Sequence, residues 1–162
     1  MYSRIKLFGH PLHPMLVAYP IAFYTSTLVG FVIYAVTNDH FWLRLTLAAN
    51  TAAVGMAAIA AVPGFIDWAG IPRGTRAKTH GLRHLILNVG SLTLFVISLL
   101  LYRDEWADSS NASATLGVIL AGAGVLIMIV SGFHGWMLIQ DDHVGVRLTP
   151  EQELLEPDGF HP

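Results

Sequence analysis

Four long apolar runs with almost no charge limit what this chain can fold into. They cover about residues 14–37, 41–66, 81–102 and 115–139. A helix needs roughly 20 apolar residues at a rise of about 1.5 Å per residue to cross a bilayer. Within lipid, the backbone must satisfy its own hydrogen bonds, which a helix does internally. Each run therefore predicts a membrane-spanning helix.

The composition supports a membrane protein and excludes several other classes. Charged residues make up only 12% of the 162 residues, whereas a soluble domain has about 25%. The net charge is −2, so no basic surface indicates a nucleic-acid partner. Cysteine is absent, which removes disulfides, thiol nucleophiles and cysteine-ligated metal centres. Eight histidines against nine lysines and arginines make histidine the residue to follow.

The short connections between the runs predict neighbouring helices that alternate in direction. We therefore expect an all-α integral membrane four-helix bundle, up-down-up-down, with both termini on the same side. Residues 1–146 form its single membrane domain, and no tandem repeat is evident. Pro20 predicts a kink in the first span. In the acidic tail, 147–162, the pattern Thr149-Pro150-Glu151-Gln152 predicts a short helix over about 150–156.

Charge and tryptophan placement predict the orientation of the bundle. Seven of the nine cations fall on the terminal side: Arg4, Lys6, Arg73, Arg76, Lys78, Arg83 and Arg147. Trp68 and Trp136 mark the same interface, whereas Trp42 and Trp106 mark the opposite one. The positive-inside rule then places the N- and C-termini in the cytoplasm. We expect a multi-pass protein of the inner (plasma) membrane in contact with the lipid bilayer.

Alternation of the spans brings most histidines to one membrane face. The residues concerned are His10, His13, Asp67, His80, His84, His134 and His143. Ionisable groups at membrane depth are rare and usually functional, so this face is the predicted site. Ordinary roles stay open for some of them. His10 and His13 could be satisfied by backbone or headgroups, His80 could be solvated, and Asp67 could cap a helix or pair with Arg73 or Arg76.

Two chemistries suit this group of side chains. The first is b-type haem held by two axial imidazoles on facing helices, either His84 with His134 or His13 with His84. Arg76 or Arg83 would then meet the propionates. The second is a transition-metal ion, for which imidazole and carboxylate are suitable ligands. Its possible ligands are His10, His13, Asp67, His84 and His143, and Asn88 could orient His84.

Three functions follow from these alternatives. The leading one is a small b-type haem protein, or subunit, that exchanges electrons with a quinone pool or a redox complex. The second is a structural or assembly subunit of a larger membrane complex, indicated by small-residue surfaces in the second and fourth spans. The third is a protein with a non-haem metal site. Hydrolase, nucleotide-binding and metalloprotease motifs are missing, and the residues leave open whether the chain is an enzyme.

Several segments resemble the prokaryotic membrane family called domain of unknown function 2231. They are Gly9-His10-Pro11-Leu12-His13-Pro14, the stretches 17–22 and 64–68, His84 with Asn88, and His143-Val144-Gly145-Val146. The resemblance covers about residues 9–146. It implies a four-span bundle in a bacterial inner membrane, similar in layout to small membrane cytochrome b folds. It favours His10, His13, Asp67, His84 and His143, whereas His134 stands where the family pattern is a Gly-Gly stretch.

Overall fold

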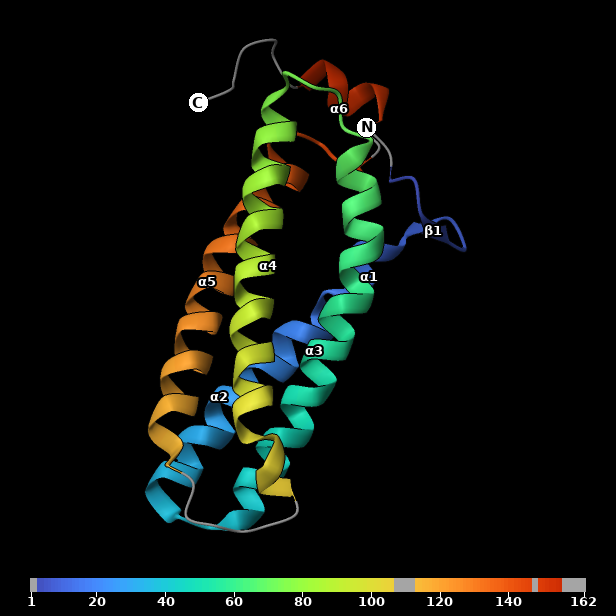
Figure 1. The fold of residues 1–162 in the computed structure, drawn as a ribbon. Helices are drawn as coiled ribbons and strands as arrows, with labels where there is room; N and C mark the ends of the chain where they lie inside the picture. The colour runs from blue at the N-terminus through green and yellow to red at the C-terminus, as the bar shows by residue number, and fades with distance from the viewer. Residues whose placement is uncertain (1–2, 107–112, 147–148, 156–162) are drawn as a thin grey trace.

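The computed structural model describes residues 3–106, 113–146 and 149–155, and four long helices dominate them. They are α2 (Ala18–Thr37), α3 (His40–Ala69), α4 (Arg76–Tyr102) and α5 (Ala114–Gln140). Successive helices lie side by side and alternate in direction (Figure 1). All four spans are long and apolar enough to cross a membrane. The expected all-α membrane bundle is confirmed.

The first span, Leu12–Thr37, is interrupted close to Pro20. The short helix α1 (Leu12–Leu16) ends one residue before α2 begins, and Val17 lies between them. Pro20 has no N–H to donate to the carbonyl of Leu16, and its ring crowds that carbonyl. The distortion expected from Pro20 therefore falls three residues upstream, at Val17. This residue keeps a right-handed helical backbone, and its N–H donates to the carbonyl of His13 at 3.2 Å.

The third span begins earlier than its apolar run. The side chain of Thr75 accepts a hydrogen bond from the backbone N–H of Lys78 at 3.2 Å, which caps the N-terminus of α4. The helix therefore starts at Arg76 and includes the polar residues up to His80. At its other end, a 3-10 turn, η1 (Arg103–Trp106), continues the chain.

The core combines aromatic side chains with small residues on the facing helices. Phe31 and Phe95 are fully buried. They pack against Gly117 and Gly124 so closely that neither glycine has room for a Cβ atom. The small-residue surface of the fourth span is therefore used largely inside the bundle. This removes part of the reason for expecting a partner subunit there.

The two halves of the bundle repeat one another in space. Tyr24 of α2 stacks on Phe95 of α4 with ring centres 3.8 Å apart, and Phe31 contacts Tyr102 at 5.0 Å. Both pairs join positions 71 apart in the sequence (24 and 95, 31 and 102). The last residues of α3 (Ala69) and α5 (Gln140) are also 71 positions apart, so we infer that the half ending with α3 corresponds to the half made by α4 and α5. The repeat escapes the sequence because few paired positions carry identical residues.

Short elements complete the end of the bundle where the chain begins. Strands β1 (Lys6–Leu7) and β2 (His10–Pro11) form an antiparallel hairpin. The helix α6 (Pro150–Leu155) lies at the same end (Figure 1). The Gln152 side chain accepts from the backbone N–H of Thr149 at 2.9 Å, so the capping box is formed. Residues 147–148 and 156–162 of the predicted tail lie outside the described residues.

Candidate functional site

His13 is held in a closely fitted position against α3. Its Nδ1 lies 2.8 Å from the carbonyl oxygen of Ala60. A carbonyl can only accept, so Nδ1 carries the proton, and in the neutral ring Nε2 then keeps its lone pair. The ring lies directly over Gly64, where an added Cβ would stand 2.7 Å from the Cε1 and Nδ1 atoms of His13. Only glycine at position 64 admits the imidazole.

His84 is held in the same way against α5. Its Nδ1 lies 2.8 Å from the carbonyl oxygen of Ser131, and its ring lies over Gly135, where a Cβ would stand 2.9 Å from Cε1. Each histidine is 47 residues before its acceptor. Each glycine follows the acceptor by four. The histidine seats are therefore part of the 71-residue repeat (13 and 84, 60 and 131, 64 and 135).

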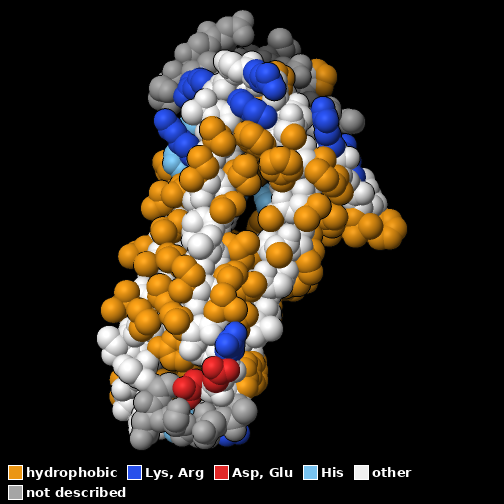
Figure 2. Space-filling view, viewed as in Figure 1, with side chains coloured by type: hydrophobic (Ala, Val, Ile, Leu, Met, Phe, Trp, Pro, Cys, Tyr) orange, Lys and Arg blue, Asp and Glu red, His pale blue; other side chains and the backbone are white. Residues whose placement is uncertain are grey.

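The two imidazoles meet inside the bundle. Their ring centres are 6.2 Å apart, and the ring planes are nearly perpendicular at 84°. Both rings have their Nδ1 proton committed to the backbone, so Nε2 is the nitrogen of each that can bind a metal. In Figure 2 a narrow opening crosses the apolar belt, and a histidine side chain is visible in its wall.

Polar side chains hydrogen-bond the His84 ring, whereas the bond given for the His13 ring among the described residues goes to a backbone carbonyl. Asn88 donates from Nδ2 to His84 Nε2 at 3.1 Å and to the Ser131 hydroxyl at 2.7 Å. The position equivalent to Asn88 in the first half is Val17. The bond from Asn88 agrees with an unprotonated Nε2 on His84. It also means that a metal at this nitrogen would replace a hydrogen bond that the protein itself supplies.

A second cluster of titratable groups lies nearer the end of the bundle. His80 is only 7% exposed, and its Nδ1 lies 2.7 Å from Asp142 Oδ2. The ring centre of His134 is 6.3 Å from that of His80, and His134 Nδ1 is buried with no hydrogen-bond partner among the described residues. His80 is therefore buried and paired, not solvated. The ring of His134 therefore lies next to that of His80, and the ring of His84 lies next to that of His13.

The remaining predicted ligands lie apart and have local roles. His10 is exposed and bonds the carbonyl of Phe8 at 3.0 Å. Asp67 accepts from the Ser3 hydroxyl and from the backbone N–H of Arg4, both at 2.7 Å, and so ties the N-terminal segment to α3. His143 has a left-handed backbone with φ of 51° in the turn after α5. Within the described residues, no three His, Asp or Glu side chains form a group that could hold a metal ion.

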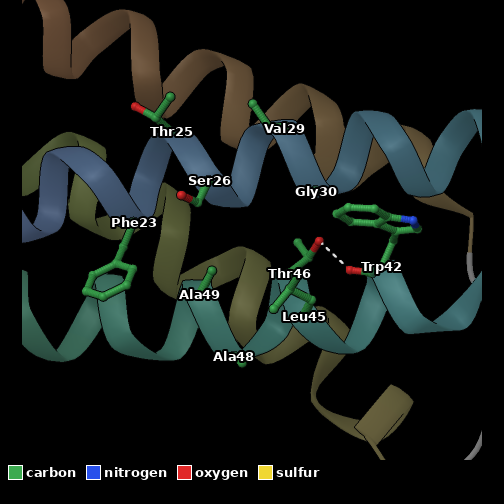
Figure 3. A pocket seen from close by; sticks show the side chains of 10 residues that line it. All are labelled: Phe23, Thr25, Ser26, Val29, Gly30, Trp42, Leu45, Thr46, Ala48 and Ala49. Carbon is green, nitrogen blue, oxygen red and sulfur yellow. Dashed lines mark hydrogen bonds between the residues drawn. The ribbon is translucent and has the colours of Figure 1, made fainter.

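A groove between α2 and α3 lies away from the histidines (Figure 3). It has a volume of about 560 Å³ and is lined mainly by apolar side chains such as Phe23 and Trp42. The hydroxyls of Thr25 and Ser26 bond the carbonyls of Ile21 and Ala22 in their own helix. These hydroxyls are satisfied, so the groove presents an essentially apolar surface.

Sequence reasoning did not identify Ala60, Gly64, Ser131 or Asp142 as site residues, whereas Gly135 was expected beside the ligands. Ala60, Gly64, Ser131 and Gly135 form the seats of His13 and His84, and Asp142 holds His80. A signal for the seats was present. Each glycine follows a small residue by four positions, which marks a helix face that a ring can approach closely.

Comparison with known proteins identifies a family. The family model described as "Predicted membrane protein (DUF2231)" matches residues 9–148. No curated protein and no solved structure matches the chain.

Proposed function

We propose that this chain, which belongs to the DUF2231 family of predicted membrane proteins, holds a b-type haem between His13 and His84 and transfers electrons in the membrane. The observation that carries the proposal is the matched seating of these two imidazoles. Each has its Nδ1 proton directed to a backbone carbonyl, the arrangement that presents a basic Nε2 to a metal.

The distance between the rings is compatible with both imidazoles holding one metal ion. An imidazole ring centre lies about 1 Å from its nitrogen, and metal–imidazole bonds are about 2 Å long. Two imidazoles on one ion would therefore have centres at most roughly 6 Å apart. The ring centres of His13 and His84 are 6.2 Å apart.

The number of ligands favours haem over a bare metal ion. Structural zinc is held by four protein ligands and catalytic zinc by three. In a b-type haem the macrocycle supplies four nitrogens, so the protein need add only two histidines. Within the described part of the chain, His13 and His84 have no third His, Asp or Glu placed to complete a metal-binding group.

The protein's own groups would bind and orient the cofactor. His13 and His84 would hold the iron, and the carbonyls of Ala60 and Ser131 would keep both rings in the ligating tautomer. Arg76 and Arg83, at the start of α4, are the proposed partners of the propionates. The haem would supply one-electron exchange, with a quinone pool or a partner subunit as donor or acceptor.

We place the histidine-bearing end of the bundle at the cytoplasmic face of a bacterial inner membrane. Arg4, Lys6 and the four cations from Arg73 to Arg83 lie at this end. Arg44, near the start of α3, and Arg103, just after α4, lie at the opposite end. The positive-inside rule supports this orientation. A protease-accessibility assay on a tagged terminus, in intact cells and inverted vesicles, tests it.

The test of the haem proposal is a reduced-minus-oxidised visible spectrum with iron analysis of the gently solubilised protein. We expect a Soret band and a b-type α band, both lost in His13→Ala and His84→Ala. His10→Ala is the matched control, because His10 is exposed in the same motif. A wild-type protein without haem bands and without iron would overturn the proposal. A protein that binds a stoichiometric metal ion without haem bands, and that loses this metal in His13→Ala, would show that the site holds a metal ion instead of haem.

A second candidate function is a structural or assembly subunit. The observation favouring it is that both Nδ1 atoms and His84 Nε2 already have hydrogen-bond partners inside the protein. In that case His13→Ala and His84→Ala lower stability or assembly while the spectrum stays featureless throughout. Co-purification of a fixed set of membrane proteins would support this candidate.

A further inference from the structure

The N-terminal hairpin turns on a residue that is poorly suited to its backbone. β1 and β2 pair Lys6 with Pro11 and Leu7 with His10, so Phe8 and Gly9 form a two-residue turn. Their φ angles are 49° and 84°. A turn with both central residues left-handed favours Asn-Gly or Asp-Gly, and a bulky residue at positive φ is strained. The geometry of the turn therefore does not explain why position 8 is a phenylalanine.

The side chains at the tip of the hairpin are apolar and exposed. Phe8 is 92% exposed, more than any other large hydrophobic side chain among the described residues, and Leu7 is 45% exposed. Most of the other exposed large hydrophobic side chains belong to the long helices, whereas these two project from the bundle on a separate arm. A strained backbone that presents a large aromatic side chain is an observation from which function can be inferred.

The hairpin is a fixed arm. Asp67, near the end of α3, accepts from the Ser3 hydroxyl and from the backbone N–H of Arg4, both at 2.7 Å. The backbone N–H of Leu12 donates to the carbonyl of Ile5 at 3.0 Å. Both ends of the hairpin are therefore tied to the bundle, and the direction of the tip is set by the fold.

The tip projects sideways from the bundle (Figure 1) at the level of the apolar belt (Figure 2). Most of the Lys and Arg side chains visible at this end lie above that level. The side chain of Arg4 lies over Gly70, where a Cβ would stand 2.5 Å from Arg4 Nε. Cations above and apolar side chains below follow the order of headgroups and acyl chains at a membrane interface.

We propose that Leu7 and Phe8 form a lateral membrane anchor, which inserts into the interfacial region of a bilayer containing anionic glycerophospholipids. Phe8 would contact the upper acyl chains, and Arg4 and Lys6 would lie at the depth of the lipid phosphates. This contact accounts for an aromatic residue at a position where the turn favours asparagine. The proposal does not depend on whether haem is bound.

The absence of cysteine makes site-directed spin labelling direct. Phe8→Cys is labelled with a nitroxide in vesicles of equimolar phosphatidylcholine and phosphatidylglycerol. Its accessibility to oxygen and to a water-soluble nickel chelate is measured by electron paramagnetic resonance. Ile86→Cys, on the exposed apolar face of α4, is the lipid reference. Arg73→Cys, in the exposed connector before α4, is the water reference.

We expect the label at position 8 to be reached by oxygen in preference to nickel, at a depth of about 5–10 Å below the headgroup boundary. A label that behaves like the one at position 73 would overturn the proposal. A label shielded from both reagents would also overturn it, because a protein partner or a second copy would then cover the tip.

A second measurement separates the role of Phe8 from that of the turn. Leu7→Cys is labelled alone and in combination with Phe8→Asn, which supplies the favoured Asn-Gly turn. We expect an unchanged or higher melting temperature and a several-fold rise in nickel accessibility at position 7. Equal accessibility in the two proteins would show that Phe8 does not anchor the hairpin.

Discussion

His13 and His84 occupy equivalent places in the two halves of the bundle. Each donates from Nδ1 to a backbone carbonyl 47 residues further along the chain. Each lies over a glycine four residues beyond that carbonyl, and their ring centres are 6.2 Å apart. A repeated fold has therefore placed one identical side chain from each half at a shared point.

The glycines under the two imidazoles should not tolerate a methyl group. Gly135→Ala would put a Cβ 2.9 Å from His84 Cε1 and 3.1 Å from its Nδ1. Displacing the ring costs about 1–3 kcal/mol, which exceeds the gain of about 1 kcal/mol in helix propensity. We expect a lower melting temperature and a weaker Soret band. Gly64→Ala should do the same through His13.

Gly132 is the matched control for Gly135, three residues away on the same helix. A Cβ at Gly132 meets nothing within 4 Å. Gly132→Ala should therefore raise stability by about 0.5–1 kcal/mol and leave the spectrum unchanged. Equal effects of Gly132→Ala and Gly135→Ala would contradict the described seat of His84.

Asn88 should stabilise the protein without being needed to bind the cofactor. Asn88→Ala removes the donor to His84 Nε2 and to the Ser131 hydroxyl. The cost is about 1–3 kcal/mol, since both partners are largely buried. We expect a lower melting temperature with retained haem, because Nε2 of His84 is left available. Thr93→Ala, which removes only an exposed bond to the carbonyl of Val89, is the control.

Loss of haem from Asn88→Ala at unchanged stability would show instead that Asn88 acts at the cofactor. Spectra and thermal unfolding recorded on the same samples distinguish the two outcomes.

Asp142 should stabilise the end of the bundle through His80. Asp142→Ala removes the carboxylate oxygen that lies 2.7 Å from His80 Nδ1, and this buried nitrogen then loses its acceptor. An unsatisfied buried donor costs about 1–3 kcal/mol. We expect a lower melting temperature and intact haem bands, because His80 is not a proposed ligand. Asp141→Ala, one residue before, should have little effect on either. Loss of the haem bands in Asp142→Ala would move the cofactor towards His80 and His134.

The sequence leaves two pairings of histidines open, His84 with His134 and His13 with His84. It does not distinguish them, because all three residues fall at similar depths on their spans. In the structure, Ser131 and Gly135 accept the ring of His84, while His134 lies beside His80. The depth of a residue along a span can be estimated from the hydrophobic length of that span. The rotation of a helix about its axis, which decides the neighbour that each side chain meets, cannot be estimated in this way.

Asp67 shows the same limit. Its place after the second span suggested a metal ligand, a helix cap or a partner for Arg73 or Arg76, yet its carboxylate holds Ser3 and Arg4, more than 60 residues earlier. A tie between the N-terminal segment and the end of α3 depends on where the hairpin lies, and no local pattern records it.

Four spans and the gathering of most histidines at one end follow from the amino-acid sequence alone. Apolar length sets a span, and short connections force alternation, so neither conclusion needs tertiary contacts. The packing of the helices was needed to show that His13 lies beside His84, that Gly64 and Gly135 admit their rings, and that the halves are related by 71 positions. Those facts depend on which helix faces meet. In a bundle whose lipid-facing and core-facing surfaces are both apolar, hydrophobic periodicity cannot distinguish them.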